Sequence, residues 1–298
     1  MYEIGVVVKA QENGQDLMNL SLKRGADVRA LIKSEDVFFS HSFVEQANLT
    51  PERIGRFRTE TIAERRLRLS NEMIETLQGR VAHGPFKGLH LDPVPGWGSM
   101  DLCSMLLGTY EIEVMEALHS SELAHCSHLV NIGAADGYYA VGGLYNGRFE
   151  TADCFELTKA GRQTIKRNAN HNGVVDKIRI FGEAGSDFPN MIGDVDWAQT
   201  ILLCDIEGAE FELLDEDCLD RLSKSTILIE VHNWVEDFQS KYHNLLERVA
   251  SRFNIKLLER SALPAHFLPE LRGYPDDNRL LMLSEGRPNI MRFLLLSN

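Results

Sequence analysis

Side chains that could do chemistry follow four short apolar runs of this 298-residue chain. Carboxylates can bind hydroxyl groups or take up protons, and a histidine titrates near neutral pH. In an open α/β sheet, the carboxyl ends of parallel strands meet at one edge, where ligands bind. We therefore expect these side chains to form one site. The candidate residues are, in chain order, Asp136, Glu156, Asp205, Glu207, Glu230 and His232.

Asp136 belongs to the segment 129–144, which predicts a buried strand, a turn punctuated by glycine, and a helix. Gly133 and Gly137 let the backbone approach a ligand where a Cβ would enter the space of that ligand. A pyrophosphate would bind the free N–H groups at the start of such a helix, but Asp136 would repel it. A ligand with an adenosine group and a positive charge, but no phosphate, fits better. S-adenosylmethionine is such a ligand.

Glu156 stands at the end of the second predicted strand, nineteen residues beyond Gly137. The two oxygens of its carboxylate match the two hydroxyls of a ribose. Taken alone, an acidic residue there could simply cap the next helix. Next to the glycine turn, we expect it to hold the cofactor.

Asp205 and Glu207 follow the strand predicted at 200–204, and His232 follows the next strand. Alternation along that strand places Glu230 and His232 on one side of the sheet. With its ordinary pKa of about 6.5, His232 is a usable proton acceptor near neutral pH. We expect it to be the general base, with Asp205 and Glu207 orienting the acceptor or the cofactor. Glu210 is expected to be a solvated residue in the first turn of a helix.

The elements that must position these residues alternate between strand and helix. Apolar runs predict the strands, and helical spacing of apolar residues predicts the helices. Strands are expected at 129–132, 151–155, 178–181, 200–204, 226–231 and 254–258, with an added strand within 289–296, and helices at 137–144, 159–170, 210–214 and 238–253. This pattern predicts an α/β fold with a doubly wound, mostly parallel (Rossmann-like) sheet, covered on both faces.

Residues 1–108 are less regular, and we expect a mainly helical accessory region there, beside a main domain at 109–298. Apolar residues at helical spacing predict a helix at 59–77. The loop at 272–277 and the accessory region are where we expect acceptor specificity, since loops at the edge of a sheet vary.

The composition of the chain excludes several classes of binding partner. The net charge of −13 argues against an extended surface for nucleic acid or for anionic membranes. No apolar run approaches the roughly 20 residues that a membrane span needs. The five cysteines form no C-x-x-C pair, so we expect no zinc site, and their odd number suits a reducing cytoplasm.

Together these stretches resemble class I S-adenosylmethionine-dependent methyltransferases, and within that class the FkbM family. The resemblance covers roughly residues 130–231. Its matching residues are Gly133-Ala134-Ala135-Asp136-Gly137-Tyr138-Tyr139, then Glu156, then Asp205-Ile206-Glu207-Gly208-Ala209-Glu210. The resemblance implies a methyltransferase domain that binds cofactor through Asn131, Gly133, Ala134, Asp136, Gly137, Glu156 and Asp205. It also implies O-methylation of a small-molecule or glycan acceptor, often a sugar or a secondary metabolite.

The match has departures. Asn131 stands where many class I enzymes have an acidic residue, and Ala135 stands where many have a glycine. Asn131 can still accept a hydrogen bond, but it carries no charge.

Three alternatives therefore stay open. The fold could serve a binding or scaffold protein without turnover, or a nicotinamide dehydrogenase, although the loop lacks the G-x-G-x-x-G pattern. A divalent metal bound by Asp205, Glu230 and Asn233 could also activate the acceptor. We favour a route without metal, because the sequence holds no complete metal motif.

Overall fold

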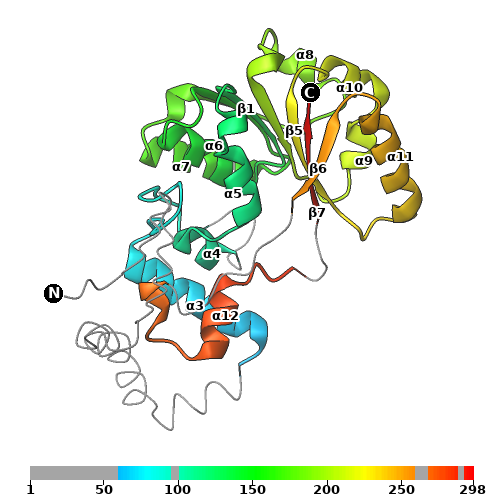
Figure 1. Ribbon diagram of the computed structural model, residues 1–298. Coiled ribbons are helices and arrows are strands. Elements are labelled where there is room, and N and C mark those ends of the chain that lie inside the picture. The colour runs from blue at the N-terminus through cyan, green and yellow to red at the C-terminus, as the bar shows by residue number, and fades with distance from the viewer. Residues whose placement is uncertain (1–59, 95–100, 259–267, 288–291) are drawn as a thin grey trace, which may run out of the picture.

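The computed structural model describes residues 60–94, 101–258, 268–287 and 292–298 (Figure 1). Its centre is a seven-stranded sheet in the order β3-β2-β1-β4-β5-β7-β6. The strands are β1 (His128–Ile132), β2 (Thr151–Phe155), β3 (Ile178–Phe181), β4 (Thr200–Cys204), β5 (Thr226–Val231), β6 (Asn254–Leu258) and β7 (Arg292–Ser297). The first five strands are parallel to one another, and β7 runs antiparallel between β5 and β6.

Helices cover both faces of the sheet, so the central strands are buried on both sides (Figure 1). One face packs against α5 (Ile112–Leu118), α6 (Tyr138–Tyr145) and α7 (Lys159–His171). The other packs against α8 (Phe188–Ile192), α9 (Glu210–Leu213), α10 (Glu216–Arg221) and α11 (Phe238–Ala250). The predicted Rossmann-like fold is confirmed. The sequence predicts it well because strands buried on both faces are continuous apolar runs.

A smaller helical unit lies below the sheet in Figure 1. It consists of α3 (Ile62–Leu77), α4 (Leu102–Leu107) and α12 (Asp276–Leu283), which pack against one another. Thr61 begins α3 with a capping box, since its hydroxyl accepts the N–H of Glu64 and the Glu64 carboxylate accepts the N–H of Thr61.

The segment 272–277 is only partly the loop that we predicted. Residues from Asp276 onward form α12, whose first turn carries Asp276 and Asp277, where carboxylates suit the helix dipole. Because α12 packs on α3 and α4, the helical unit draws on both sides of the predicted boundary at residue 108. That boundary stays a prediction, and residues 1–59 lie outside the described part of the chain.

Within the described residues, the helices are too short or too polar to cross a membrane. All five cysteines are buried and free, which places Cys154 and Cys204 in the core of the sheet, where the sequence predicted them.

Candidate active site

The loop between β1 and α6 is built by internal hydrogen bonds. The N–H groups of Gly133 and Ala134 both donate to the carbonyl oxygen of Phe155, each at 2.9 Å. The N–H of Gly137 donates to Ala134 at 2.7 Å, and the N–H of Ala135 donates to the Glu156 carboxylate at 3.0 Å. These four amides therefore offer no free donors to a pyrophosphate, which would need them.

The two loop glycines are required by the protein itself. A Cβ on Gly133 would lie 1.6 Å from the carbonyl oxygen of Asp205, and one on Gly137 would lie 3.1 Å from Val141. Both have a positive φ, which side-chain-bearing residues rarely adopt. We expected a Cβ to enter the space of the cofactor. In the structure it would first meet the end of β4 or the neighbouring helices.

Glu156 holds the loop in place from the end of β2. It is 6% exposed, and its carboxylate accepts the N–H of Ala135, the N–H of Thr158 at 2.7 Å and the Thr158 hydroxyl at 2.6 Å. A carboxylate has about four acceptor positions, so about one is left for a ribose hydroxyl. Glu156 thus has a structural role that the sequence did not predict.

Asn131 carries an unsatisfied acceptor at the end of β1. The residue is 2% exposed, and its Oδ1 has no hydrogen-bond partner in the described structure. A buried polar atom without a partner is costly, so the position calls for a donor from a ligand or from water. Ala134 is also buried, whereas Asp136 is half-buried and its carbonyl accepts the side-chain amide of Asn168 at 2.9 Å.

The remaining predicted residues gather on the same face of the sheet as Asn131. Leu203 and Leu228 pack in the core on the α6 side, and alternation places Asp205, two residues beyond Leu203, on that side as well. Glu230 and His232 follow Leu228 in the same way.

His232 lies among carboxylates. Its ring is 1% exposed, with Nε2 at 3.3 Å from Asp205 Oδ1, 3.7 Å from Glu230 Oε2 and 3.9 Å from Glu207 Oε2. Nδ1 lies 3.1 Å from Glu210 Oε1. Burial alone lowers the pKa of His232, but hydrogen bonds to Asp205 and Glu210 outweigh it and raise this pKa to about 9. The ring is therefore protonated at neutral pH, which argues against the role of general base that we predicted for it.

Glu207 is better placed to take a proton. Its side chain is 49% exposed, and burial together with the nearby Asp205 raises its pKa above the usual range. Its φ is +56°, one of five positive values among the described non-glycine residues. Ala135 in the loop after β1 and Glu111 before α5 are two of the others. Such conformations cluster at functional sites.

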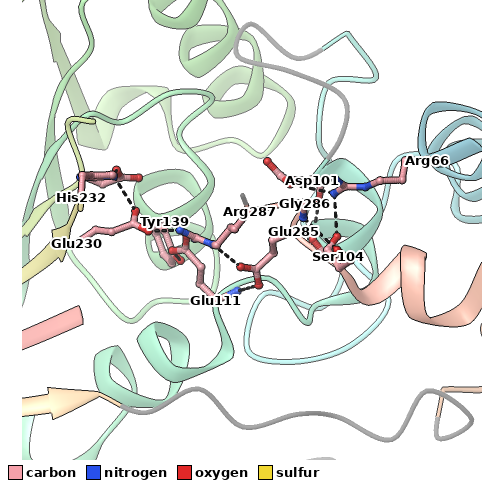
Figure 2. A network of polar contacts seen from close by, with 12 residues as sticks. Arg66, Asp101, Ser104, Glu111, Tyr139, Glu230, His232, Glu285, Gly286 and Arg287 are labelled. Carbon is pink, nitrogen blue, oxygen red and sulfur yellow. Dashed lines mark hydrogen bonds and ion pairs between the residues drawn. The ribbon is translucent and has the colours of Figure 1, made fainter. Parts of the chain in front are cut away.

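Figure 2 shows a polar network that the sequence did not predict. The guanidinium of Arg287 contacts the carboxylates of Glu111 and Glu230, and its Nε donates to Glu285 at 2.8 Å. The three carboxylates are 1%, 2% and 7% exposed. Glu111 also accepts the hydroxyl of Tyr139, in the first turn of α6. Arg287 therefore connects α6, through Glu111 and Tyr139, with Glu230 at the end of β5.

No sequence signal points to Glu111, Glu285 or Arg287, because they come together from distant parts of the chain. Glu210 was visible in the sequence but misinterpreted. It is fully buried, not solvated.

Within the described residues, one group of side chains offers ligands for a metal ion. Ligand atoms of Asp205, Glu207 and His232 lie within 4.8 Å of one another. In the structure, however, both ring nitrogens of His232 face carboxylates, so a proton already supplies positive charge there. A crevice of about 430 Å³ lies at the amino ends of β1 to β3, at the opposite edge of the sheet from this site.

Comparisons with known proteins do not assign this chain to a family. No family model and no curated protein matches the chain. Among solved structures, the O-methyltransferase from Bacillus cereus in complex with SAH is 10% identical (78% of this chain, 91% of that chain, TM-score 0.41). The ribosomal protein L11 methylase from Lactobacillus delbrueckii is 14% identical (70% and 83%, TM-score 0.40). Precorrin 8w decarboxylase from Methanobacterium thermoautotrophicum is also 14% identical (63% and 90%, TM-score 0.41). At such values the function must be argued from the site.

Proposed function

We propose that this protein is an S-adenosylmethionine-dependent methyltransferase that methylates a hydroxyl group of a small acceptor. The observation that carries the proposal is the unsatisfied Oδ1 of Asn131, buried at the edge of the sheet where Asp205 and Glu230 also lie. An orphaned acceptor beside carboxylates suits a cationic ligand with an ammonium group.

The chain offers a place for each part of that cofactor. Asn131 would accept from its ammonium group, and Glu156 would use its remaining acceptor position for the ribose. Leu157, next to Glu156, is 68% exposed, and an adenine ring would cover this apolar side chain. Gly133, Ala134, Asp136 and Gly137 shape the loop around it.

The same features disfavour a nicotinamide cofactor. A dinucleotide brings a pyrophosphate, and four loop amides that could bind it donate to the protein instead. Asp136 adds a negative charge to the same loop.

For the reaction, the bound cofactor would supply an already activated methyl group. The protein must then align an acceptor oxygen and remove its proton. Glu207 would accept that proton, since it is exposed and its pKa is raised. Asp205, 32% exposed, would orient the acceptor. His232 would act as a fixed donor. Membership of the FkbM family and a sugar-like acceptor belong to this proposal.

The test is formation of S-adenosylhomocysteine from S-adenosylmethionine with a panel of sugars and polyols. Glu207→Gln is expected to lower turnover by about 10²–10⁴-fold with little change in cofactor affinity. Glu212→Gln, a carboxylate 68% exposed in α9, is the matched control and should leave turnover unchanged. Equal turnover in Glu207→Gln and wild type would eliminate Glu207 as the base.

Two other outcomes are informative. Cofactor binding without turnover on any acceptor would favour a scaffold protein on this fold. Loss of turnover with a chelator, restored by magnesium, would favour a metal held by Asp205, Glu207 and His232 over the proton that we place there.

A further inference from the structure

Glu210 is a buried carboxylate at the start of α9 that the proposed reaction does not use. Its exposed fraction is 0%. Oε2 accepts the N–H of Gly208 at 2.9 Å, and Oε1 accepts the N–H of His232 at 2.9 Å while facing Nδ1 of the same ring at 3.1 Å. One side chain thus ties the loop after β4 to the end of β5.

These contacts fix both the position and the orientation of the His232 ring. With its backbone N–H and its Nδ1 bound to one carboxylate oxygen, the ring has little freedom to rotate. Its Nε2 is then directed at Asp205 Oδ1, at 3.3 Å. The Trp234 ring packs against it, with centroids 4.8 Å apart.

Both ring nitrogens of His232 therefore face carboxylate oxygens. A carboxylate only accepts hydrogen bonds, and a neutral imidazole has a single N–H. Only the imidazolium can donate to Glu210 and Asp205 at the same time.

We propose that Glu210 is a positioning residue, which holds His232 as a fixed donor so that its Nε2–H orients the Asp205 carboxylate toward the acceptor. The role assigned to Asp205 rests on the proposed function, whereas the state of the His232 ring does not. An oriented donor–acceptor chain of this kind keeps a ligand-facing carboxylate in one geometry.

Charged groups from every neighbouring element act on this ring. Asp205 and Glu207 come from the loop after β4, Glu210 from α9 and Glu230 from β5. Arg287 opposes them indirectly, because it contacts the other oxygen of Glu230. Burial raises the pKa of Glu230 to about 11, so Glu230 stays protonated near neutral pH, and the cationic form of the ring is favoured chiefly by Asp205 and Glu210.

The experiment is ¹⁵N NMR of the histidine rings in the ligand-free, full-length protein, with the His232 signals assigned by their loss in His232→Gln. At about pH 7, both nitrogens of His232 should carry protons. Glu210→Gln keeps the size of the side chain but removes its charge, and it should lower the His232 titration midpoint by about one unit or more. Asp205→Asn should lower it as well.

Asp92→Asn is the matched control. Asp92 is also a buried carboxylate that accepts a backbone N–H, from Val94, but its ion pair is with Arg167 of α7. Its substitution should leave the His232 midpoint in place. Glu210→Asp retains the charge and shortens the reach, so it gives an intermediate midpoint and covers the case in which Glu210→Gln does not fold.

A neutral His232 ring at about pH 7 in the wild type would overturn the proposal, as would an unchanged midpoint in both Glu210 variants. Titration with S-adenosylmethionine separates this result from the proposed function. Glu210→Gln should bind it within about threefold of the wild type, because Glu210 faces His232. Absence of binding in the wild type would refute the cofactor, not the positioning of His232.

Discussion

Gly133 lies where the cofactor loop crosses the end of β4, and its missing side chain allows that crossing. Its φ is +78°, and a Cβ would lie 1.6 Å from the carbonyl oxygen of Asp205. The absence of a Cβ thus lets the loop after β1 pack against the backbone of Asp205, whose carboxylate we propose faces the acceptor. A ligand held by the loop would then lie next to Asp205.

Gly133→Ala is expected to lower the free energy of unfolding by about 3 kcal/mol or more, since it adds a backbone clash to the cost of a left-handed residue. Gly147→Ala is the control, because Gly147 has nearly the same φ, +77°, with no atom within 4 Å. It should cost only about 1 kcal/mol. Urea unfolding of both variants measures the difference, and equal losses would contradict the close approach.

Glu156→Gln tests the proposed ribose contact at the level of one atom. Gln retains the packing and an acceptor oxygen, but it loses the charge. We expect the affinity for S-adenosylmethionine to fall about tenfold, and about ten- to hundredfold in Glu156→Ala. Glu156→Ala should also destabilise the fold, because three donors lose their partner. If calorimetry shows unchanged affinity in both variants, Glu156 does not bind the ribose.

The raised pKa of His232 makes the free energy of unfolding depend on pH. Its pKa in the folded protein is about 9, above the roughly 6.5 of an unfolded histidine. The stabilisation is therefore complete below about pH 6.5 and is lost as the pH rises through 9. The stabilisation amounts to about 3 kcal/mol. Urea unfolding across this range should show a smaller decline in His232→Gln, and parallel curves would refute the raised pKa.

At the scale of elements, the strands and most helices follow from the sequence. The predicted strand at 151–155 is β2, and the one at 226–231 is β5. Buried parallel strands are apolar throughout, and glycine or polar residues end them, so their limits are visible in the chain. The helix α12 escaped prediction, since its charged first turn, Asp276-Asp277, resembles a loop when packing is unknown.

The site was predictable only in part, for the same reason. Residues at strand ends, such as Asp205 and His232, are placed by strand topology. Arg287 and Glu111 are 176 residues apart in the chain, and only the folded structure brings their side chains together. The protonation state of a residue such as His232 also depends on neighbouring side chains from other elements, which no local sequence pattern specifies.

Arg287 connects the chain after α12 to the sheet, and its loss should be costly. Arg287→Met leaves Glu111, Glu230 and Glu285 without their cation, and we expect about 2–4 kcal/mol of destabilisation near neutral pH. Burial raises the pKa of Glu111 to about 8 and that of Glu230 to about 11, so the loss should grow as the pH rises through about 8 and Glu111 gives up its proton. Thermal unfolding at two pH values measures it.

Arg66→Met is the matched control within the same network (Figure 2). Arg66 is also buried, but it donates to the carbonyl oxygen of Ser284 at 3.0 Å and lies 3.5 Å from the Asp101 carboxylate. Its substitution should cost about 1–2 kcal/mol. If Arg287→Met costs no more than Arg66→Met at neutral pH, Arg287 does not neutralise the buried carboxylates.

At the scale of the whole molecule, the protein is negatively charged, and so is the candidate site. The chain carries a net charge of −13, and several of its carboxylates are gathered at the carboxyl edge of β4 and β5. Such a field attracts cations and repels phosphate-bearing ligands. Both the orphaned Asn131 oxygen and the internally satisfied loop amides agree with a cofactor that is cationic and free of phosphate.

The most direct test is calorimetric titration of the full-length protein with S-adenosylmethionine, S-adenosylhomocysteine and NAD⁺. We expect saturable binding of S-adenosylmethionine at one site, competition by S-adenosylhomocysteine, and no binding of NAD⁺. Saturable binding of NAD⁺ in place of S-adenosylmethionine, or no binding of S-adenosylmethionine by the folded protein, would contradict it.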